Sequence, residues 1–472
     1  MTAMQFKLYN TQSRSVEILE PATPGHFKIY CCGPTVYSYQ HVGNFKTFIN
    51  EDTLVRALRY LGYTTTHVTN ITDVGHNVGD GDEGEDKMAV AAKRESRSIL
   101  DIAKFYTDKF LADWKKLNLL TPDILCKATD HILEMIELIK RIEANGFCYE
   151  SGGNIYFDVQ KFKQYGSLAN LNLEDLRAGA RIEIDKNKRH PADFVLWFTK
   201  SKYENHELQW ESPWGRGYPG WHIECSAMSI KYLGDQFDIH CGGIDHIPVH
   251  HTNEIAQSEA ATGKSWVRYW MHCEHILLNN EKISKSTGNY VLLDDLAREG
   301  ISPEAYKLLV YGTHYRKNMN FALESLQAAQ KSIDRLKLLV IDLKSKVDED
   351  CTTLLKTDLS EVSQIAQFKA AICNDLNMAQ AVAILWEIAN ASIEPKLKLA
   401  ALLNIDQVLA FDMQNWKADS ITITPEVKTL LDARHLARQN KQWAESDRLR
   451  DEIKNLGFEV LDAAGEQKLK KL

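Results

Sequence analysis

Side chains that could bind a metal ion occur in three separate segments of the chain. Cys32 ends a short apolar run, and Cys225 lies in the segment WHIEC of residues 221–225. His250 and Glu254 are four residues apart, a spacing that puts both side chains on one face if the segment is helical. Two thiolates, an imidazole and a carboxylate suit zinc, so these residues could form a zinc site if the fold assembles them.

Other possible ligands stand close to these positions, and spacing alone does not choose between them. They are Cys31, His222, His240, Cys241, His246 and His251. Neighbouring residues of a strand point to opposite faces, so only one of Cys31 and Cys32 can serve a given site. A cluster of Cys241, His246 and His250 stays possible, and so does simple burial of the cysteines in an apolar core.

Two polar segments have the composition of a nucleotide-binding site. Residues 41–44 (HVGN) follow a predicted strand, where the N-terminus of the next helix attracts phosphate and a histidine can donate to it. Residues 282–286 (KISKS) hold two lysines and two serines, and such a loop can close over a triphosphate. Either segment alone would also fit a solvated surface loop. Their occurrence together, in this order, favours a nucleotide site.

These segments need a framework that brings strand ends and helix starts together. An apolar run at 27–32, stopped by a Gly-Pro pair, predicts a strand, and strands are also predicted at 67–72 and 236–241. Apolar residues with a helical period predict a helix over about 47–61. The order strand–helix–strand predicts a parallel α/β sheet, which binds ligands at the carboxyl ends of its strands.

The remaining segments indicate further domains. Residues 120–205 have the pattern of an insertion, with a helix predicted at 129–144 and a hairpin at 147–158. From about residue 320 the helical period predicts a helix bundle. A polar break near residues 418–420 separates a small C-terminal unit.

Composition limits the class of protein. The chain has 472 residues, 44% hydrophobic and 25% charged, which is typical of a globular protein with two to four domains. No apolar run approaches the about 18 residues of a membrane span. Nine unevenly spaced cysteines favour reduced thiols in the cytoplasm. A net charge of -8 gives no general attraction to nucleic acid, so any such binding must use local groups.

Several longer segments, taken in order, resemble the cysteinyl-tRNA synthetases, a family of class I aminoacyl-tRNA synthetases. They are 30–37 (YCCGPTVY), 70–73 (NITD), 219–228 (PGWHIECSAM), 250–257 (HHTNEIAQ) and the C-terminal segment 438–457. The resemblance covers essentially the full length. It implies a Rossmann-like parallel-sheet catalytic domain with an inserted connective domain, followed by a helical bundle and a small C-terminal domain.

The same resemblance implies the domain boundaries. The Rossmann catalytic domain is expected at 1–119 and 206–265, the inserted connective, acceptor-end domain at 120–205, the signature-loop stem-contact region at 266–322, the tRNA-binding helical bundle at 323–418 and the anticodon-binding domain at 419–472.

The family resemblance implies an enzyme that activates L-cysteine with ATP and transfers it to the 3′ end of tRNA(Cys), with zinc selecting the thiol. The alternative is a cysteine ligase with the same adenylation core and a small-amine acceptor, which the C-terminal segment disfavours. A catalytically inactive tRNA-binding protein is disfavoured by Lys282 and Lys285. The expected partners are tRNA(Cys), L-cysteine and ATP. The protein is expected to be a monomer in the cytoplasm and not to bind a membrane.

The resemblance also assigns site residues. One zinc ion per chain would be held by Cys32, Cys225, His250 and Glu254. ATP, as its magnesium complex, would meet His41, Gly43, Asn44, Gly243, Asp245 and Lys285, with His41, Lys282 and Lys285 catalytic. The cysteine pocket would be lined by Gly33, Thr72 and Trp221. In the C-terminal domain, Arg438, Trp443 and Arg448 are the candidate tRNA contacts.

Three positions depart from the family pattern. Asn44 stands where the first signature usually ends in a second histidine, and asparagine can donate a hydrogen bond but cannot carry charge. Cys241 occupies a position that often holds glycine and adds a thiol near the site. Ile283 replaces a methionine, which keeps both volume and apolar character.

Overall fold

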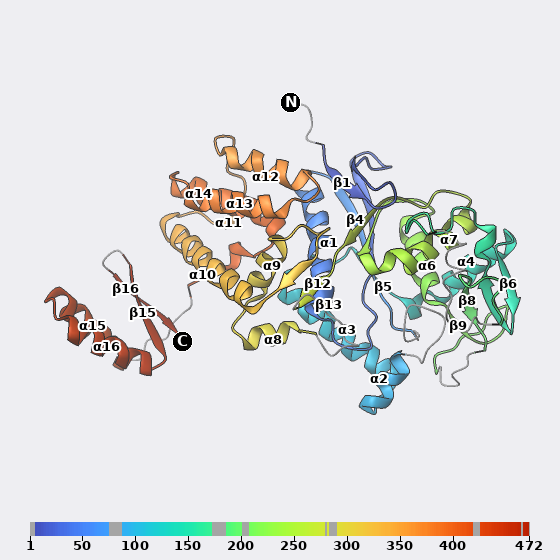
Figure 1. Cartoon of the computed structure of the whole chain (residues 1–472). Coiled ribbons are helices and arrows are strands. Elements are labelled where there is room, and N and C mark those ends of the chain that lie inside the picture. The colour runs from blue at the N-terminus through green and yellow to red at the C-terminus, as the bar shows by residue number, and fades with distance from the viewer. Residues whose placement is uncertain are drawn as a thin grey trace. The chain divides into compact units, whose positions relative to one another are not determined.

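The computed structural model describes residues 5–74, 87–171, 186–200, 207–278, 281–282, 290–418, 425–463 and 466–471. The chain divides into two compact units, Met1–Gln414 and Asn415–Leu472, which are described separately (Figure 1).

A five-stranded parallel sheet with the strand order β11-β10-β3-β4-β5 forms the centre of the larger unit. Most side chains of its inner strands are buried, as expected of a parallel sheet covered by helices on both faces. The direction in which successive strands are added reverses between β3 and β10, and ligands bind at such a switch point. The expected Rossmann-like sheet is therefore confirmed. Its strands are β3 (His26–Cys31), β4 (Thr64–Ile71), β5 (Ile124–Lys127), β10 (Phe237–Gly243) and β11 (Val267–Cys273).

Helices cover the two faces of this sheet. On one face α1 (Val42–Tyr60) packs against β4, β10 and β11, and on the other α6 (Trp221–Leu233) packs against β3 and β4 (Figure 1). Helices α4 (Ile132–Ala144) and α7 (Thr252–Thr262) pack on α6. Helix α1 begins five residues before the predicted start at 47, because His41 and Asn44 cap its N-terminus.

The segment between β5 and α6 adds a four-stranded antiparallel sheet of order β6-β7-β8-β9. The predicted hairpin is confirmed as β6 and β7, joined by Gly152 and Gly153, which both have the positive φ that a two-residue turn requires. The expected inserted domain of residues 120–205 does not coincide with this antiparallel sheet. Strand β5 lies inside that range but pairs with β4 in the parallel sheet, and β9 lies beyond it. The strands are β6 (Cys148–Ser151), β7 (Asn154–Phe157), β8 (Phe194–Phe198) and β9 (Tyr218–Pro219).

Smaller elements complete the catalytic part of the unit. An N-terminal hairpin, β1 and β2, lies beside β11, and after β11 the chain forms a small sheet of order β13-β12-β14. These elements are β1 (Lys7–Asn10), β2 (Ser15–Ile18), α2 (Lys87–Glu95), α3 (Ile99–Lys116), β12 (Ile276–Leu278), β13 (Glu281–Lys282), α8 (Leu293–Arg298), α9 (Pro303–Tyr311) and β14 (Met319–Phe321).

A helix bundle ends the larger unit, as predicted from the helical period after residue 320. Apolar side chains such as Leu336, Ile384 and Leu402 are fully buried between its helices. The helices are α10 (Leu323–Lys346), α11 (Cys351–Leu354), α12 (Ser363–Cys373), α13 (Met378–Asn390) and α14 (Pro395–Leu409).

One buried carboxylate joins this bundle to the catalytic part. Asp375, between α12 and α13, accepts hydrogen bonds from the backbone N–H of Tyr9 (2.8 Å) and the hydroxyl of Tyr315 (2.5 Å). The guanidinium of Arg316 donates to it through two nitrogens, at 2.8 and 2.5 Å. Asp375 and the following Leu376 both have positive φ, a strained conformation for residues other than glycine. Three distant segments therefore depend on a single side chain.

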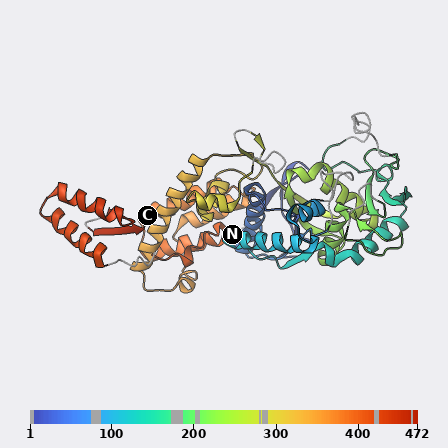
Figure 2. The same cartoon turned by 90° about the horizontal axis from the view of Figure 1, so that it is seen from below.

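The C-terminal unit is a pair of helices packed on a two-stranded hairpin. Figures 1 and 2 both show α15 (Pro425–Gln439) and α16 (Trp443–Asn455) side by side. The hairpin consists of β15 (Phe458–Ala463) and β16 (Glu466–Lys471). The small apolar core of this unit includes Val427, Ile453 and Phe458. None of the helices in the described ranges of the whole chain is long and apolar enough to span a membrane.

The Asp375 junction yields a stability prediction. Asp375→Asn keeps the size of the side chain but removes the charge that Arg316 faces, so the variant should be less stable by about 2–4 kcal/mol. Thermal unfolding followed by calorimetry would measure the loss. The matched control is Asp342→Asn, which removes an exposed ion pair with Lys346 on α10 and should change stability by no more than about 0.5 kcal/mol. Equal melting temperatures for the two variants would contradict the prediction.

Candidate active site and metal centre

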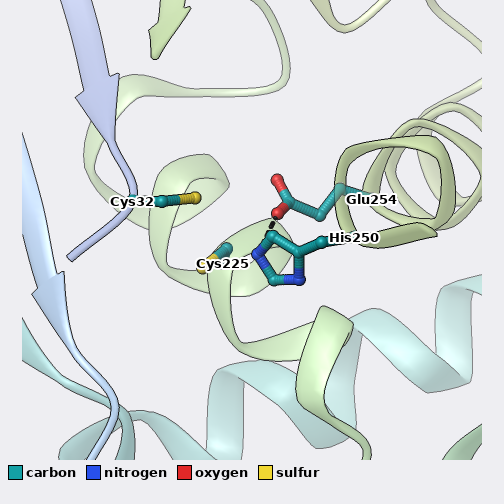
Figure 3. Close-up of side chains that lie close together, drawn as sticks. All are labelled: Cys32, Cys225, His250 and Glu254. Atoms are coloured by element: carbon teal, nitrogen blue, oxygen red, sulfur yellow. Dashed lines mark ion pairs between the residues drawn. The ribbon is translucent and has the colours of Figure 1, made fainter. Parts of the chain in front are cut away.

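Four side chains from three separate segments of the chain converge beside the switch point of the sheet. Cys32 directly follows β3, Cys225 lies in α6, His250 lies in a π-helical turn and Glu254 in the first turn of α7 (Figure 3). One donor atom from each lies within 4.8 Å of the other three, and all four residues are buried. The structure thus brings together the four ligands expected from the sequence.

The local backbone explains this convergence. The pairing of β3 with β10 continues past the end of β3, where the N–H of Cys32 donates to the Cys241 carbonyl at 3.2 Å. Cys32 therefore faces α6 and α7, whereas Cys31 lies against Cys241 and Glu51 of α1. The π-helical turn Ile247–His251 runs directly into α7. His250 and Glu254, four residues apart, therefore lie about one helical turn apart and face the same side.

The charges in this pocket fit a bound cation. A hydrogen bond from the Cys32 thiol lowers the pKa of Cys225 to about 6, although burial opposes the charge. Burial also raises the pKa of Glu254, but His250 and His240 outweigh it and lower the value to about 2. In the same way Glu254 and Cys225 overcome burial and raise the pKa of His250 to about 10. Without a metal the pocket therefore needs a proton on His250 to balance its negative charge.

The positions of the facing atoms of His250 and Glu254 also fit a bound cation. Nε2 of His250 lies 2.6 Å from Oε1 of Glu254. Yet this buried Oε1 has no partner with hydrogen-bond geometry among the described residues. The buried Oε1 is therefore left for a ligand that the structure does not contain, and a cation bound beside it would satisfy it. The donor set of two sulfurs, one nitrogen and one oxygen suits zinc.

Three further histidines support the ligands. His222 Nδ1 lies 3.0 Å from Nδ1 of His250, so one ring donates to the other and the orientation of His250 is fixed. His240 Nε2 lies 2.7 Å from Oε2 of Glu254. His251 Nε2 lies 3.4 Å from the sulfur of Cys32. Such contacts hold metal ligands in place.

A second set of possible ligands shares two residues with the first. The donor atoms of Cys32, His240, His251 and Glu254 also lie within 4.8 Å of one another. Both ring nitrogens of these histidines are already engaged, however. The second nitrogen of His240 lies 3.3 Å from the Cys241 carbonyl, and that of His251 lies 2.7 Å from His272. We therefore assign His240 and His251 supporting roles.

The alternative cluster left open by the sequence is not assembled. Among the described residues, the donor atoms of Cys241, His246 and His250 form no such group. The reason is the alternation of β10, which directs Cys241 toward Cys31 and away from His250. The extra thiol of Cys241 is therefore buried on the other side of the sheet from the four ligands.

The three residues expected to line the cysteine pocket lie next to the metal ligands. The ring of Trp221 stacks on that of His250, with centroids 4.2 Å apart. The Gly33 N–H donates to Oδ1 of Asn70 at 2.8 Å, and a Cβ at Gly33 would lie only 1.6 Å from the Asn70 carbonyl oxygen. Thr72 donates its hydroxyl proton to Oε2 of Glu224 at 3.0 Å. Sequence reasoning gave Asn70 and Glu224 no role, although both lie within the family-like segments.

The nucleotide-site candidates divide between described and undescribed residues. Asn44 Oδ1 accepts from the backbone N–H of His41 at 3.1 Å, and Nδ1 of His41 accepts from that of Asn44 at 3.3 Å. Asn44 thus serves as a helix cap, a role that needs no charge. The His41 ring lies over Gly43, where a Cβ would come within 2.8 Å of it.

The other nucleotide candidates follow strand ends. Gly243 ends β10, and the exposed Asp245 lies 3.2 Å from His275. The backbone of Lys282 lies in β13, but its side chain and all of Lys285 fall outside the described residues.

Comparison with known proteins gives a consistent result. Residues 18–331 match the family model described as "tRNA synthetases class I (C) catalytic domain", and residues 422–468 match the "Cysteinyl-tRNA ligase anticodon binding domain". The chain is 47% identical to the cysteine–tRNA ligase of Treponema denticola, with 99% of this chain and 100% of that protein covered. It is 43% identical to cysteine–tRNA ligase 1 of Burkholderia lata, with 99% and 97% covered.

A solved structure supports the fold alone. Mycobacterium tuberculosis methionyl-tRNA synthetase in complex with methionyl-adenylate aligns with a TM-score of 0.54 at 15% identity, covering 81% of this chain and 89% of that one.

The four-ligand pocket predicts the effect of removing one sulfur. Cys225→Ser should weaken zinc binding by at least about 100-fold, because a hydroxyl is a harder and far less acidic ligand than a thiol. Zinc per chain after dialysis would be measured by atomic emission spectroscopy. Cys31→Ser is the control: it changes the residue next to Cys32 but on the opposite face, and should keep its zinc. Full zinc content in the Cys225 variant would refute the assignment.

Proposed function

Because the chain belongs to the class I cysteinyl-tRNA synthetases, we propose that it activates L-cysteine with ATP and transfers the cysteinyl group to the 3′ end of tRNA(Cys). The observation that carries this proposal is the four-ligand pocket at the switch point of the sheet, directly beside Gly33, Thr72 and Trp221.

The pocket accounts for the choice of amino acid. Zinc held by Cys32, Cys225, His250 and Glu254 would supply a soft Lewis acid that favours a thiolate over a serine hydroxyl. Gly33 lets the chain after β3 pass close to the Asn70 carbonyl, where a Cβ would clash, and the Trp221 ring stacks on the proposed ligand His250. A site built around one polar group can discriminate by about 10⁴-fold, so no editing domain is required.

Activation requires positioning and charge stabilisation. The cysteine carboxylate attacks the α-phosphorus of ATP, the bond to the β-phosphate breaks, and pyrophosphate leaves. In our proposal His41, at the N-terminus of α1, donates to the phosphates, and Lys282 and Lys285 neutralise the leaving group, with ATP bound as its magnesium complex. Gly43 and Asn44 shape this helix start. Gly243 and Asp245, at the end of β10, would hold the ribose.

The second step uses the remaining domains. A hydroxyl of the terminal tRNA ribose attacks the adenylate carbonyl, and AMP leaves. We assign residues 120–205 to the acceptor end, 266–322 to the signature loop and stem, 323–418 to the body of the tRNA and 419–472 to the anticodon. The expected monomeric state and cytoplasmic location stay predictions.

Of the three groups suggested for RNA binding, Trp443 is the most suitable. It is 58% exposed, and the Arg438 guanidinium lies 6.0 Å from its ring centroid. Arg448, by contrast, forms ion pairs with Glu445 and Glu452 on the same helix. An exposed indole can stack on an unpaired base.

The alternative acceptor is a small amine. An enzyme of that type has no use for an anticodon-binding domain, and the family match at residues 422–468 therefore favours tRNA.

The proposed activity predicts a metal-dependent preference for cysteine. ATP–pyrophosphate exchange with cysteine should exceed that with serine by about 10⁴-fold or more in kcat/KM. Treatment with a chelator should abolish the cysteine-dependent rate, and added zinc should restore it. Equal rates with the two amino acids, or no exchange at all, would refute the proposal. Absence of cysteine transfer to tRNA in an active exchange enzyme would revive the small-amine acceptor.

Stacking at Trp443 predicts a defect confined to the tRNA step. Trp443→Ala should lower kcat/KM for tRNA by about 10-fold or more, while the tRNA-independent pyrophosphate exchange stays unchanged. Leu436→Ala removes an equally exposed apolar side chain from α15 and serves as the control. A Trp443 variant that charges tRNA as well as this control would exclude the contact.

A further inference from the structure

His275 is a partly exposed histidine at the edge of the parallel sheet, and the reaction scheme above gives it no role. It lies between β11 and β12, at the same edge as the nucleotide candidates Gly243 and Asp245. Its Nδ1 lies 3.2 Å from Oδ1 of Asp245, which is within hydrogen-bond distance. A carboxylate can only accept hydrogen bonds, so the proton in this contact belongs to the histidine.

The pairing of β10 with β11 places the two residues side by side. The strands are parallel, and Gly243 at the end of β10 lies opposite Cys273 at the end of β11. After Gly243 the chain forms the short helical turn Ile244–His246, which contains Asp245. The side chain of Asp245 is 45% exposed and that of His275 is 27% exposed. A ligand that arrives at this edge of the sheet can therefore reach both.

The backbone around His275 is held from two sides. On one side the N–H of Glu274 donates to the Tyr315 carbonyl at 2.8 Å, and the His275 carbonyl accepts from the N–H of Met319 in β14 at 3.0 Å. On the other side the buried ammonium group of Lys46 in α1 donates to the carbonyls of Glu274 and Tyr315. The helix whose start is proposed to meet the phosphates of ATP is thus tied to the segment that carries His275.

A fixed donor beside Asp245 has a consequence for ligand binding. An exposed side chain loses rotational freedom when it binds a ligand, and this loss reduces the affinity. A donor on a rigid backbone restricts the side chain beforehand, so less freedom is lost on binding. An ionised carboxylate offers about four lone-pair sites, so the contact with His275 leaves capacity for hydroxyl groups of a ligand.

We propose that His275 positions the carboxylate of Asp245 for the ribose of ATP. The Nδ1–H of His275 holds the carboxylate, and the carboxylate accepts hydrogen bonds from the ribose hydroxyls. This inference rests on the proposed function and adds a residue to its nucleotide site. Because His275 acts through Asp245, it is a positioning residue. The pair should matter for nucleotide binding and little for stability, since exposed ion pairs contribute little to folding.

The test compares two nucleotides that differ only in the ribose hydroxyls. His275→Phe keeps a ring of similar size but removes the donor. The KM for ATP in cysteine-dependent pyrophosphate exchange should rise about 10-fold, whereas kcat and the KM for cysteine should stay at the wild-type values. The KM for 2′,3′-dideoxy-ATP should be the same in the variant and the wild type, because this nucleotide has no ribose hydroxyl to donate to Asp245.

Controls separate this role from a structural one. His275→Asn places an amide nitrogen near the position of Nδ1 and should restore the KM for ATP. Adding His275→Phe to Asp245→Ala should cause no further loss, because the two residues act as a unit. His26→Phe changes a histidine at the opposite end of the sheet, where its ring contacts Thr64 and Thr66, and should leave the KM for ATP unchanged. The melting temperature of His275→Phe should fall no further than that of this control.

Three outcomes would overturn the inference: an unchanged KM for ATP in His275→Phe, an equal rise in KM for ATP and its dideoxy analogue, or a further loss when His275→Phe is added to Asp245→Ala. If the wild-type enzyme shows no cysteine-dependent exchange, the proposed function itself fails. If the wild type is active but the His275 variant does not distinguish the two nucleotides, only the positioning role of His275 fails.

Discussion

The active site depends on the balance of charge around one carboxylate that is sealed from water. Glu254 is fully buried, and an ion in such surroundings is tolerated only when opposite charge and hydrogen bonds compensate it. His240 and His250 supply that compensation on its two oxygens, and His222 orients His250 in turn. A dense group of histidines is therefore the means by which the protein keeps a charged pocket folded in its interior.

The topology of the sheet explains why this pocket lies where it does. Cys32 and Cys225 are almost two hundred residues apart in the sequence, yet the strand order places the end of β3 next to that of β10. Helix α6 packs across β3 and β4, and α7 packs on α6, so that residues of both helices meet the strand end.

Local patterns in the sequence were sufficient to predict the strands and helices of the sheet, but not to identify the metal ligands. The strands at residues 27–32 and 236–241 and the hairpin at 147–158 could be predicted, because periodicity and turn residues are local signals. The start of α1 could not, since it depends on a capping pair, His41 and Asn44. Spacing could not choose between the histidines; only family resemblance suggested the four ligands that the structure brings together. The Asp375 junction has no local signal at all, because its partners lie in distant segments.

The ion pairs of the C-terminal unit have a consequence for the salt dependence of binding. Arg434 and Arg438 both pair with Asp462, and Arg448 pairs with two glutamates. Arginines that are already neutralised within the protein displace few counterions from a nucleic acid. If this unit binds RNA as proposed, these three arginines should therefore contribute little to the dependence of that binding on ionic strength.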